Sequence, residues 1–188
     1  MILLIVGLAL WAGVHFVPAL AIPFREQLIT RVGEMAYKVV FASLIVSSIV
    51  AIVFGWRSID PIYIYVLPEW SRPIASLLIL ITFILFAAAH STTNIKRALR
   101  HPQLTGLVLW SVGHLLANGD NRSLILFGTL GVWAIVEMVL INNREGDWVK
   151  PEPAPVKSEL LMLSKGLVMF AVFVFAHPYI SGMPVIPQ

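Results

Sequence analysis

The chain of 188 residues contains no cysteine. It therefore forms no disulfide, and it offers no thiolate to a zinc ion, to an iron–sulfur cluster or to a covalently attached c-type haem. A metal site in this protein would have to rely mainly on histidine, of which the sequence has five.

Charged residues are scarce as well. They make up 12% of the chain, whereas an ordinary soluble domain has about 25%. Hydrophobic residues make up 59%, and they form blocks of span length rather than short alternating runs. This composition predicts an all-α fold, a polytopic transmembrane helix bundle that forms one domain over residues 1–188.

The apolar blocks predict about six membrane spans. They cover residues 2–21, 36–55, 73–90, 104–117, 123–141 and 160–176. The last block belongs to a segment at 159–178, which follows a Pro-rich loop at 142–158. The run Pro-Glu-Pro-Ala-Pro within this loop predicts an extended linker.

The net charge of +3 comes from residues in short loops beside the spans. This placement favours anionic lipid headgroups over nucleic acid as their partner. Ten of the 13 Lys and Arg residues would lie on one side of the membrane: Arg25, Arg31, Lys38, Lys96, Arg97, Arg100, Arg144, Lys150, Lys157 and Lys165. Arg57, Arg72 and Arg122 would lie on the other side. The positive-inside rule then predicts that the ten face the cytoplasm and that both termini face outward, into the periplasm if the source is a Gram-negative bacterium.

The first span has a second interpretation as a secretory signal peptide. Ala19-Leu20-Ala21 resembles a signal-peptidase site. Against cleavage, residues 1–10 contain no Lys or Arg, and the apolar run is long. If cleavage occurs, His15 leaves the mature protein.

Several loop residues predict where helices end. Asn118-Gly119 is suited to a left-handed helix end, and Asp120 or Ser123 to capping of the next helix. We therefore expect the fourth and fifth spans to form a tight helical hairpin. Residues 91–101 predict a short interfacial helix with a basic face.

His15 and His114 are the residues most suggestive of function, because each lies inside an apolar span. Counted at 1.5 Å per residue, their depths in the bilayer differ by only about 5 Å. Trp11 and Trp110 share their helix faces at i, i+4 spacing. Gly106 and Gly113 would leave room for a planar ring near the backbone. The pattern predicts one metal or haem bound by both histidines.

Other roles for these two histidines stay open. An imidazole in a membrane bundle also serves as a hydrogen-bonding residue between helices, and a proton relay or an ion path is a further alternative. If the histidines do bind iron, each should donate its other N–H to Ser111, to Asn118 or to a backbone carbonyl.

Further polar residues are weaker candidates. His90 and His101 flank the basic segment at the cytoplasmic edge, where they could contact each other, a quinone or a substrate. His177 is predicted to be a solvated helix end. Glu137 lies within the fifth span, where we expect it to reach the surface or to pair with a basic residue of 96–100. No phosphate loop, nucleophile elbow or metalloprotease motif is present.

Several motifs together resemble the NnrU family. They are Gly13-Val14-His15 on the first span, the segment Asn94-Ile95-Lys96-Arg97-Ala98-Leu99-Arg100 leading into His101-Pro102, and His114-Leu115-Leu116-Ala117-Asn118-Gly119-Asp120. The resemblance covers roughly residues 1–145. The His-Pro and Asn-Gly-Asp combination at this spacing is its most specific part.

The resemblance implies a bacterial inner-membrane protein associated with denitrification and nitric oxide metabolism. The family includes the plant zeta-carotene isomerase, a haem b protein whose ligating histidines would match His15 and His114. Its other functional histidines look similar to His101 and His90. The present chain differs in having no cysteine, so a ligand exchange between His and Cys is excluded here.

We therefore expect haem b between the first and fourth spans, held by His15 and His114, with Trp11, Trp110 and Gly113 beside it. Asn118, Asp120, His90, His101 and Glu137 are further candidate residues. The role would be in nitric oxide metabolism or in a redox-gated isomerisation, with a small gas or an apolar molecule as ligand. The alternatives are a non-catalytic accessory of a nitric oxide or nitrite reductase, and a small transporter.

Overall fold

Five helices of the computed structural model are long and apolar enough to cross a bilayer. The structure describes residues 1–183 and 185. The five are α1 (Ile2–Leu20), α3 (Glu34–Arg57), α4 (Ser71–Ala89), α7 (Asn121–Glu145) and α8 (Val156–Ser181). The shorter helices are α2 (Ile22–Val32), α5 (Ile95–Ala98) and α6 (Pro102–Ala117). No β-strand forms within the described residues, so the predicted all-α fold is confirmed.

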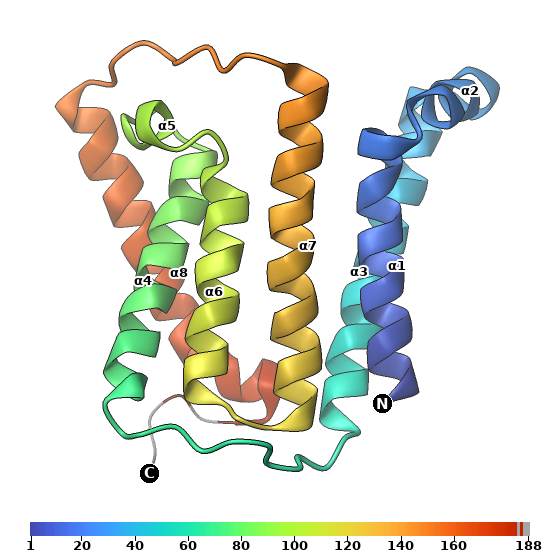
Figure 1. Cartoon of the computed structure of the whole chain (residues 1–188). Coiled ribbons are helices and arrows are strands. Elements are labelled where there is room, and N and C mark those ends of the chain that lie inside the picture. The colour runs from blue at the N-terminus through green and yellow to red at the C-terminus, as the bar shows by residue number, and fades with distance from the viewer. Residues whose placement is uncertain (184, 186–188) are drawn as a thin grey trace.

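The fourth predicted span corresponds to α6, which has 16 residues. At 1.5 Å per residue this helix is about 24 Å long. It runs beside α4 and α7 from one end of the bundle to the other (Figure 1). The bundle of about six spans is therefore as predicted, with one span shorter than the rest. The sequence did not predict α2, a polar helix that packs on α1 and α3.

The helices pack in a chain of neighbours. Helix α1 pairs with α3 and also contacts α7, which lies beside α6. Helix α6 packs on α4, and α4 packs on α8. Figure 1 shows α8 crossing the bundle behind α6, so that its C-terminal end lies near the ends of α3, α6 and α7. This crossing brings residues from the end of the chain to the middle of the bundle.

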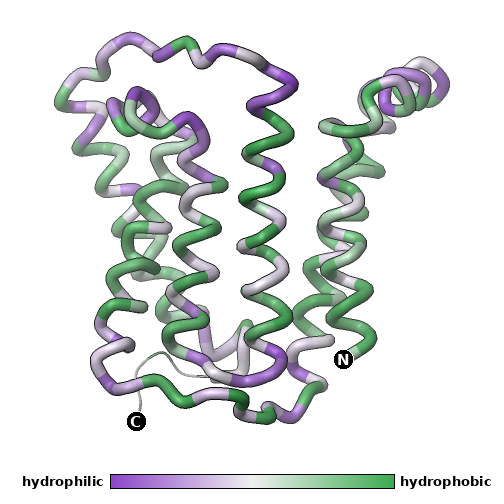
Figure 2. The backbone as a smooth tube through the Cα atoms, viewed as in Figure 1, coloured by the Kyte–Doolittle hydropathy of each residue, from purple (hydrophilic) through white to green (hydrophobic). Residues whose placement is uncertain are grey.

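The two ends of the bundle carry different segments of the chain. One end carries α2, α5 and the linker 146–155 (Figure 1), and we call it the basic end. The opposite end carries the loop 58–70 and the turn between α6 and α7, and we call it the hairpin end. Figure 2 shows hydrophilic segments at both ends and mainly hydrophobic helices between them. This distribution is the one expected of a multi-pass membrane protein.

Large apolar side chains cover the outside of the helices. Val39, Val132 and Phe175 are exposed by 57%, 63% and 79% of their surface. In water such a surface would drive aggregation. In a bilayer the lipid chains cover it, and each helix satisfies its own backbone hydrogen bonds.

Small residues allow the helices to approach closely. A Cβ at Gly55 would lie 2.5 Å from the Leu4 backbone nitrogen, and a Cβ at Gly7 would lie 2.9 Å from Ile52. These two glycines bring α1 and α3 into contact. A Cβ at Gly166 of α8 would lie 2.9 Å from Ile84 of α4. Association of helices in membranes favours such small residues, because packing rather than exclusion of water holds the helices together.

The segment 91–101 is less helical than predicted. Only Ile95–Ala98 forms a helix, and Leu99 is extended. The residues before a proline avoid the helical conformation, and Pro102 follows directly. In addition, Glu159 of α8 accepts hydrogen bonds from Thr93 Oγ1 at 2.7 Å and from the Asn94 N–H at 2.5 Å. The start of α8 therefore holds this segment in place.

A tight turn joins α6 to α7, as predicted. Asp120 caps α7, because its Oδ1 accepts the Ser123 N–H at 2.9 Å. The predicted left-handed conformation at Asn118-Gly119 is wrong, since Asn118 is extended and the positive-φ residues are Gly33, Gly146 and Gly182. Glycine is needed at position 119 because a side chain would not fit there. A Cβ there would overlap the carbonyl oxygen of Tyr65, whose backbone N–H donates to the Gly119 carbonyl.

Replacing Gly119 with Ala should therefore separate the loop 58–70 from the turn. We expect Gly119→Ala to lower the free energy of unfolding by about 2 kcal/mol, measured from thermal unfolding of the detergent-purified protein. Gly128→Ala is the control, because no atom lies within 4 Å of a Cβ at that helical position. The control should be unchanged or slightly stabilised. Equal stability of the two variants would contradict the proposed contact.

Candidate functional site

A large cavity lies at the hairpin end of the bundle. Its volume is about 740 Å³, which is within the range of about 300–1,000 Å³ common for small-molecule and cofactor sites. Residues of α1, α3, α4, α6, α7 and α8 and of the loop 58–70 line it. We call it the hairpin-end cavity. Its aromatic walls include Trp56, Phe83, Trp110, Phe127, Phe170 and Phe173.

His114 lines this cavity from the last turn of α6. Its Nδ1 lies 2.9 Å from the Trp110 carbonyl oxygen. Because a carbonyl only accepts, Nδ1 carries the proton, which leaves the Nε2 lone pair for another partner. The ring stacks on Phe127 of α7 with centroids 4.3 Å apart. A backbone carbonyl therefore fixes the tautomer, which is one of the predicted arrangements.

His177 lies on the other side of His114, on α8. The two imidazole centroids are 6.3 Å apart and the rings are inclined by 25°. The Nδ1–H of His177 donates to the Met183 carbonyl at 2.8 Å, and Ser181 Oγ lies 3.1 Å from the same nitrogen. His177 lies near the C-terminal end of α8, as predicted, and its ring is held by Met183 and Ser181. His177 is half-buried and lines the same cavity as His114.

His15 has a different environment. Its Nδ1 donates to the Trp11 carbonyl at 2.9 Å, so its Nε2 is also unprotonated. Its ring packs against Trp11, Trp133 of α7 and Phe41 of α3, with centroids 4.3, 5.0 and 5.9 Å away. Trp11 borders the hairpin-end cavity, and His15 lies one helical turn beyond it.

The contacts on α7 show how far apart His15 and His114 are in depth. His114 packs on Phe127 and His15 packs on Trp133. These residues are six positions apart, which is about 9 Å along the helix axis. The sequence predicts a smaller offset, because counting from Leu104 places His114 about 15 Å into a core about 30 Å thick. In the structure His114 is three residues before the end of α6.

The predicted residues around the two histidines have mixed roles. Trp110 packs beside His114 with centroids 4.6 Å apart and lines the cavity. Gly113 borders the cavity too, but a Cβ there would lie 3.0 Å from Ile79 of α4. Gly106 faces Phe86 of α4 at 3.0 Å in the same way. Both glycines therefore allow α4 and α6 to pack closely.

Arg122 places a buried cation at the edge of the cavity. Its Nη1 donates to the carbonyls of Trp56 and Ile59 at 3.2 and 2.9 Å, and its guanidinium lies 4.4 Å from the Trp56 ring centroid. Asp120 Oδ1 is 3.7 Å from Arg122 Nε. That nitrogen has no hydrogen-bond partner among the described residues. Asp120 itself is buried, and both of its oxygens accept from Ser123.

Asn118 and Tyr65 close the cavity beside this ion pair. The Asn118 side chain donates to the His114 carbonyl at 3.0 Å. The Tyr65 hydroxyl lies 2.9 Å from the Leu115 carbonyl oxygen and 3.1 Å from that of Asn118. Burial, followed by the negative charge of Asp120, raises the pKa of Tyr65. Asn118 therefore supports the backbone beneath His114 rather than contacting the imidazole.

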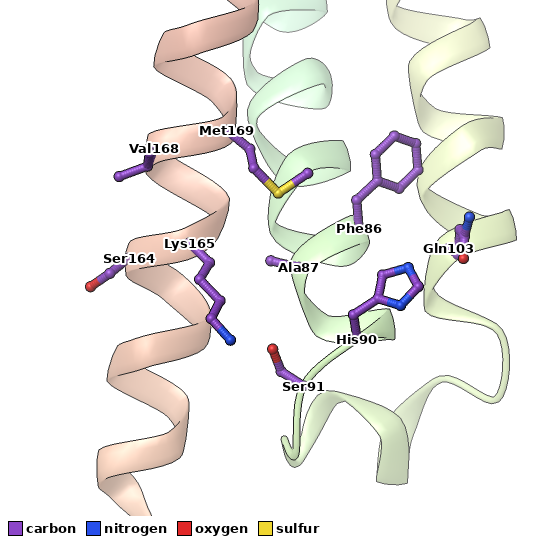
Figure 3. Close-up of a pocket in the computed structure, with 9 residues that line it drawn as sticks. All are labelled: Phe86, Ala87, His90, Ser91, Gln103, Ser164, Lys165, Val168 and Met169. Carbon is purple, nitrogen blue, oxygen red and sulfur yellow. The ribbon is translucent and has the colours of Figure 1, made fainter.

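His90 lines a second, apolar pocket near the basic end, of about 590 Å³. Figure 3 shows its imidazole on the side of Gln103, while Lys165 of α8 and Ser91 approach each other across the pocket. His101 does not line this pocket. Its Nε2 lies 2.8 Å from Asn142 Oδ1 on α7. His90 and His101 thus have separate partners.

Glu137 is buried on α7, and its Oε2 has no hydrogen-bond partner in the part of the chain that the structure describes. The predicted pairing with the segment 96–100 is wrong. Arg100 instead contacts Glu145 at 3.4 Å and donates to the Gly146 carbonyl at 2.7 Å. These groups lie at the end of α7, two turns beyond Glu137.

Within residues 1–183 and 185, no three His, Asp or Glu side chains gather as a metal site. A pair of imidazoles is nevertheless sufficient to hold a haem iron, since the porphyrin supplies the other nitrogens. His114 has the unprotonated nitrogen, the fixed tautomer and the adjoining cavity that such a ligand needs. The residues at the hairpin end therefore fit a haem better than a bare metal ion.

The sequence indicates some of the remaining site residues and not others. Phe127 and Arg122 lie in the first two turns of α7, just beyond the predicted tight turn, so the hairpin indicates that they lie at the same end of the bundle as His114. His177 has no such signal, because a linker separates α8 from α7 and leaves its position free.

One family model, described as NnrU protein, matches residues 3–185. No curated protein and no solved structure shows significant similarity to the chain.

The Tyr65 contacts predict a pH-dependent stability. Tyr65→Phe should lower the free energy of unfolding at pH 7 by about 1 kcal/mol, because it removes the hydroxyl donor to the turn. With its raised pKa, the folded protein keeps the phenolic proton after the unfolded chain has lost it near pH 10. The stabilising effect is therefore complete below about pH 10 and decreases as the pH rises further.

Thermal unfolding between pH 7 and pH 11 measures this dependence. Wild type should lose more stability across that range than Tyr65→Phe. The control is Tyr63→Phe, because the Tyr63 side chain is exposed, and it should behave as wild type. Parallel curves for wild type and Tyr65→Phe would contradict the role of the buried hydroxyl.

Proposed function

The chain belongs to the NnrU family, and we propose that it is a haem-b-binding inner-membrane protein that serves nitric oxide or denitrification metabolism. The association with denitrification comes from the family. The haem proposal comes from the histidines and from the cavity that adjoins them. Ten of the 13 basic residues lie towards the basic end, which supports a cytoplasmic position for that end and periplasmic termini.

The observation that carries the proposal is the state of His114. Its Nδ1–H donates to the Trp110 carbonyl, and its ring lies at a cavity of about 740 Å³. Iron-ligating histidines commonly have this arrangement, in which the second nitrogen donates to a backbone acceptor and orients the ring. A histidine that only held two helices together would form hydrogen bonds from its ring nitrogens to the neighbouring helix.

The walls of the cavity suit a large planar ligand. Trp110, Phe127, Phe170 and Phe173 surround it with aromatic surface. These side chains exclude water and lower the local polarity, which favours the uncharged imidazole of His114. Arg122 and Arg72 line the cavity and supply positive charge, which would attract the carboxylates of a haem. A haem bound here would provide one-electron redox chemistry.

The sequence favours His15 as the second histidine that would hold the haem. Two histidine ligands leave no open position on the iron, which favours electron transfer or redox sensing over oxygen activation. Within such a site His114 would keep its proton on Nδ1 throughout, held by the Trp110 carbonyl.

The first test is the absorbance spectrum of the protein purified in detergent from haem-replete cells, oxidised and then reduced with dithionite. We expect about one haem per chain, and we expect His114→Ala to lose at least nine-tenths of it because the ring ligand is gone. His101→Ala is the control, since its imidazole contacts Asn142 outside the cavity. The control should keep the full spectrum.

A colourless but folded wild-type protein that takes up no added haem would contradict the proposal. Co-purification with a nitric oxide or nitrite reductase would then favour the accessory role. Full haem content in His114→Ala would also contradict it, because the cavity-lining histidine would be dispensable.

A further inference from the structure

The pocket of about 590 Å³ near the basic end is separate from the hairpin-end cavity. It lies between α4, α6 and α8, and the two cavities have no lining residue in common. We call it the basic-end pocket. The proposed haem site makes no use of it, so it needs an explanation of its own.

The lining of the basic-end pocket changes from apolar to polar along both of its long helices. Helix α4 runs towards the basic end, and Phe86 precedes His90 and Ser91 along it. Helix α8 runs in the opposite direction, and Lys165 precedes Val168 along it (Figure 3). The polar groups therefore lie towards the membrane surface, and the apolar groups lie towards the bilayer interior.

Two polar groups of this pocket have no partner among the described residues. The Ser91 hydroxyl is buried and forms no hydrogen bond there. The Lys165 ammonium forms no ion pair with a described carboxylate. Glu159, the acidic residue of α8, instead accepts hydrogen bonds from Thr93 and Asn94. Figure 3 shows the Lys165 amine and the Ser91 hydroxyl directed towards each other across the pocket, an arrangement that suits an anionic group placed between them.

Close packing of α8 on α4 fixes the two sides of the pocket. A Cβ at Gly166 would lie 2.9 Å from the Ile84 Cα. Met162 is only 1% exposed and packs against Ala87. These contacts lie on either side of Lys165 in the sequence of α8, so the fold sets the position of its backbone opposite the end of α4.

The pocket is accessible from the lipid, because Val168 on its wall is exposed by 62% of its surface. A molecule that enters from the bilayer would meet an apolar wall first and a cation with a hydroxyl at the membrane surface. Basic pockets between membrane helices bind the phosphate head groups of anionic lipids in this way. A soluble phosphate would have no use for the apolar wall.

We propose that the basic-end pocket is a specific site for one anionic phospholipid of the adjoining leaflet. Its phosphate lies between Lys165 and Ser91, and one of its acyl chains lies against Phe86 and Val168. A zwitterionic lipid fits less well, because its own positive charge lies beside the Lys165 ammonium. This site is independent of haem binding.

The test measures lipid retention by native mass spectrometry of the full chain, purified in detergent and stripped of lipid. The probes are phosphatidylglycerol and phosphatidylcholine with identical acyl chains. Wild type should bind phosphatidylglycerol about fivefold more tightly, and Lys165→Gln should remove this preference. The control Lys157→Gln removes the same charge from the first turn of α8, outside the pocket, and should bind as wild type.

Two further measurements separate a lipid site from general surface charge and from a phosphate site. Ser91→Ala leaves the net charge unchanged and should weaken phosphatidylglycerol binding about threefold. Glycerol phosphate, which has no acyl chain, should not displace the bound lipid.

Three outcomes would overturn the proposal: equal binding of the two lipids by wild type, an equal loss in Lys165→Gln and Lys157→Gln, or displacement of the lipid by glycerol phosphate. Lys165→Gln should keep the haem content of wild type, whatever that content is. A failure of the lipid site is therefore distinguishable from a failure of the proposed function.

Discussion

The turn between α6 and α7 is the constraint on which the candidate site depends. Three residues connect the two helices, and Asp120 ends the turn by capping α7. The loop 58–70 is attached to the same turn, since the Ile64 and Tyr65 N–H groups both donate to the Gly119 carbonyl. This attachment sets the positions of α3 and α4 as well. The short connection also keeps the end of α6 beside the start of α7, where His114 packs on Phe127.

Much of the fold follows from the sequence because the bilayer permits few structures. Backbone groups in lipid must be satisfied within the segment, so each long apolar block becomes a helix. The cap at Asp120 and the backbone acceptor for His114 follow from local rules that act within four residues. The left-handed turn at Asn118-Gly119 does not form. Gly119 instead packs closely against Tyr65, a residue that is distant in the sequence and that local rules do not consider.

The position of His177 could not be predicted for a related reason. The linker 146–155 is long enough to let α8 start far from α7, and the apolar pattern of α8 does not specify which helices it crosses. In the structure α8 packs along α4 and ends behind α6.

The surroundings of Glu137 could not be predicted either. Arg100 was expected to pair with it, but Arg100 contacts Glu145 and donates to the Gly146 carbonyl. These contacts depend on where α7 ends, which the sequence does not fix.

Three of the eight buried side-chain atoms that lack a hydrogen-bond partner among the described residues border the hairpin-end cavity. A buried donor without a partner costs about 1–3 kcal/mol, and a folded protein has only about 5–15 kcal/mol of net stability. Trp11 Nε1, Trp56 Nε1 and Arg122 Nε are such donors among the described residues, and all three side chains border the hairpin-end cavity.

In a membrane no water is at hand to satisfy these groups from the lipid side. A polar ligand in the cavity would recover part of this free energy on binding. Apolar residues at these positions would pack the helices without leaving buried donors unsatisfied. His114 and His177 also line this cavity, and each has its Nδ1 hydrogen-bonded to a backbone carbonyl, which leaves its Nε2 unprotonated. The buried donors beside the cavity therefore lower the stability of the bundle by the free energy of their missing hydrogen bonds.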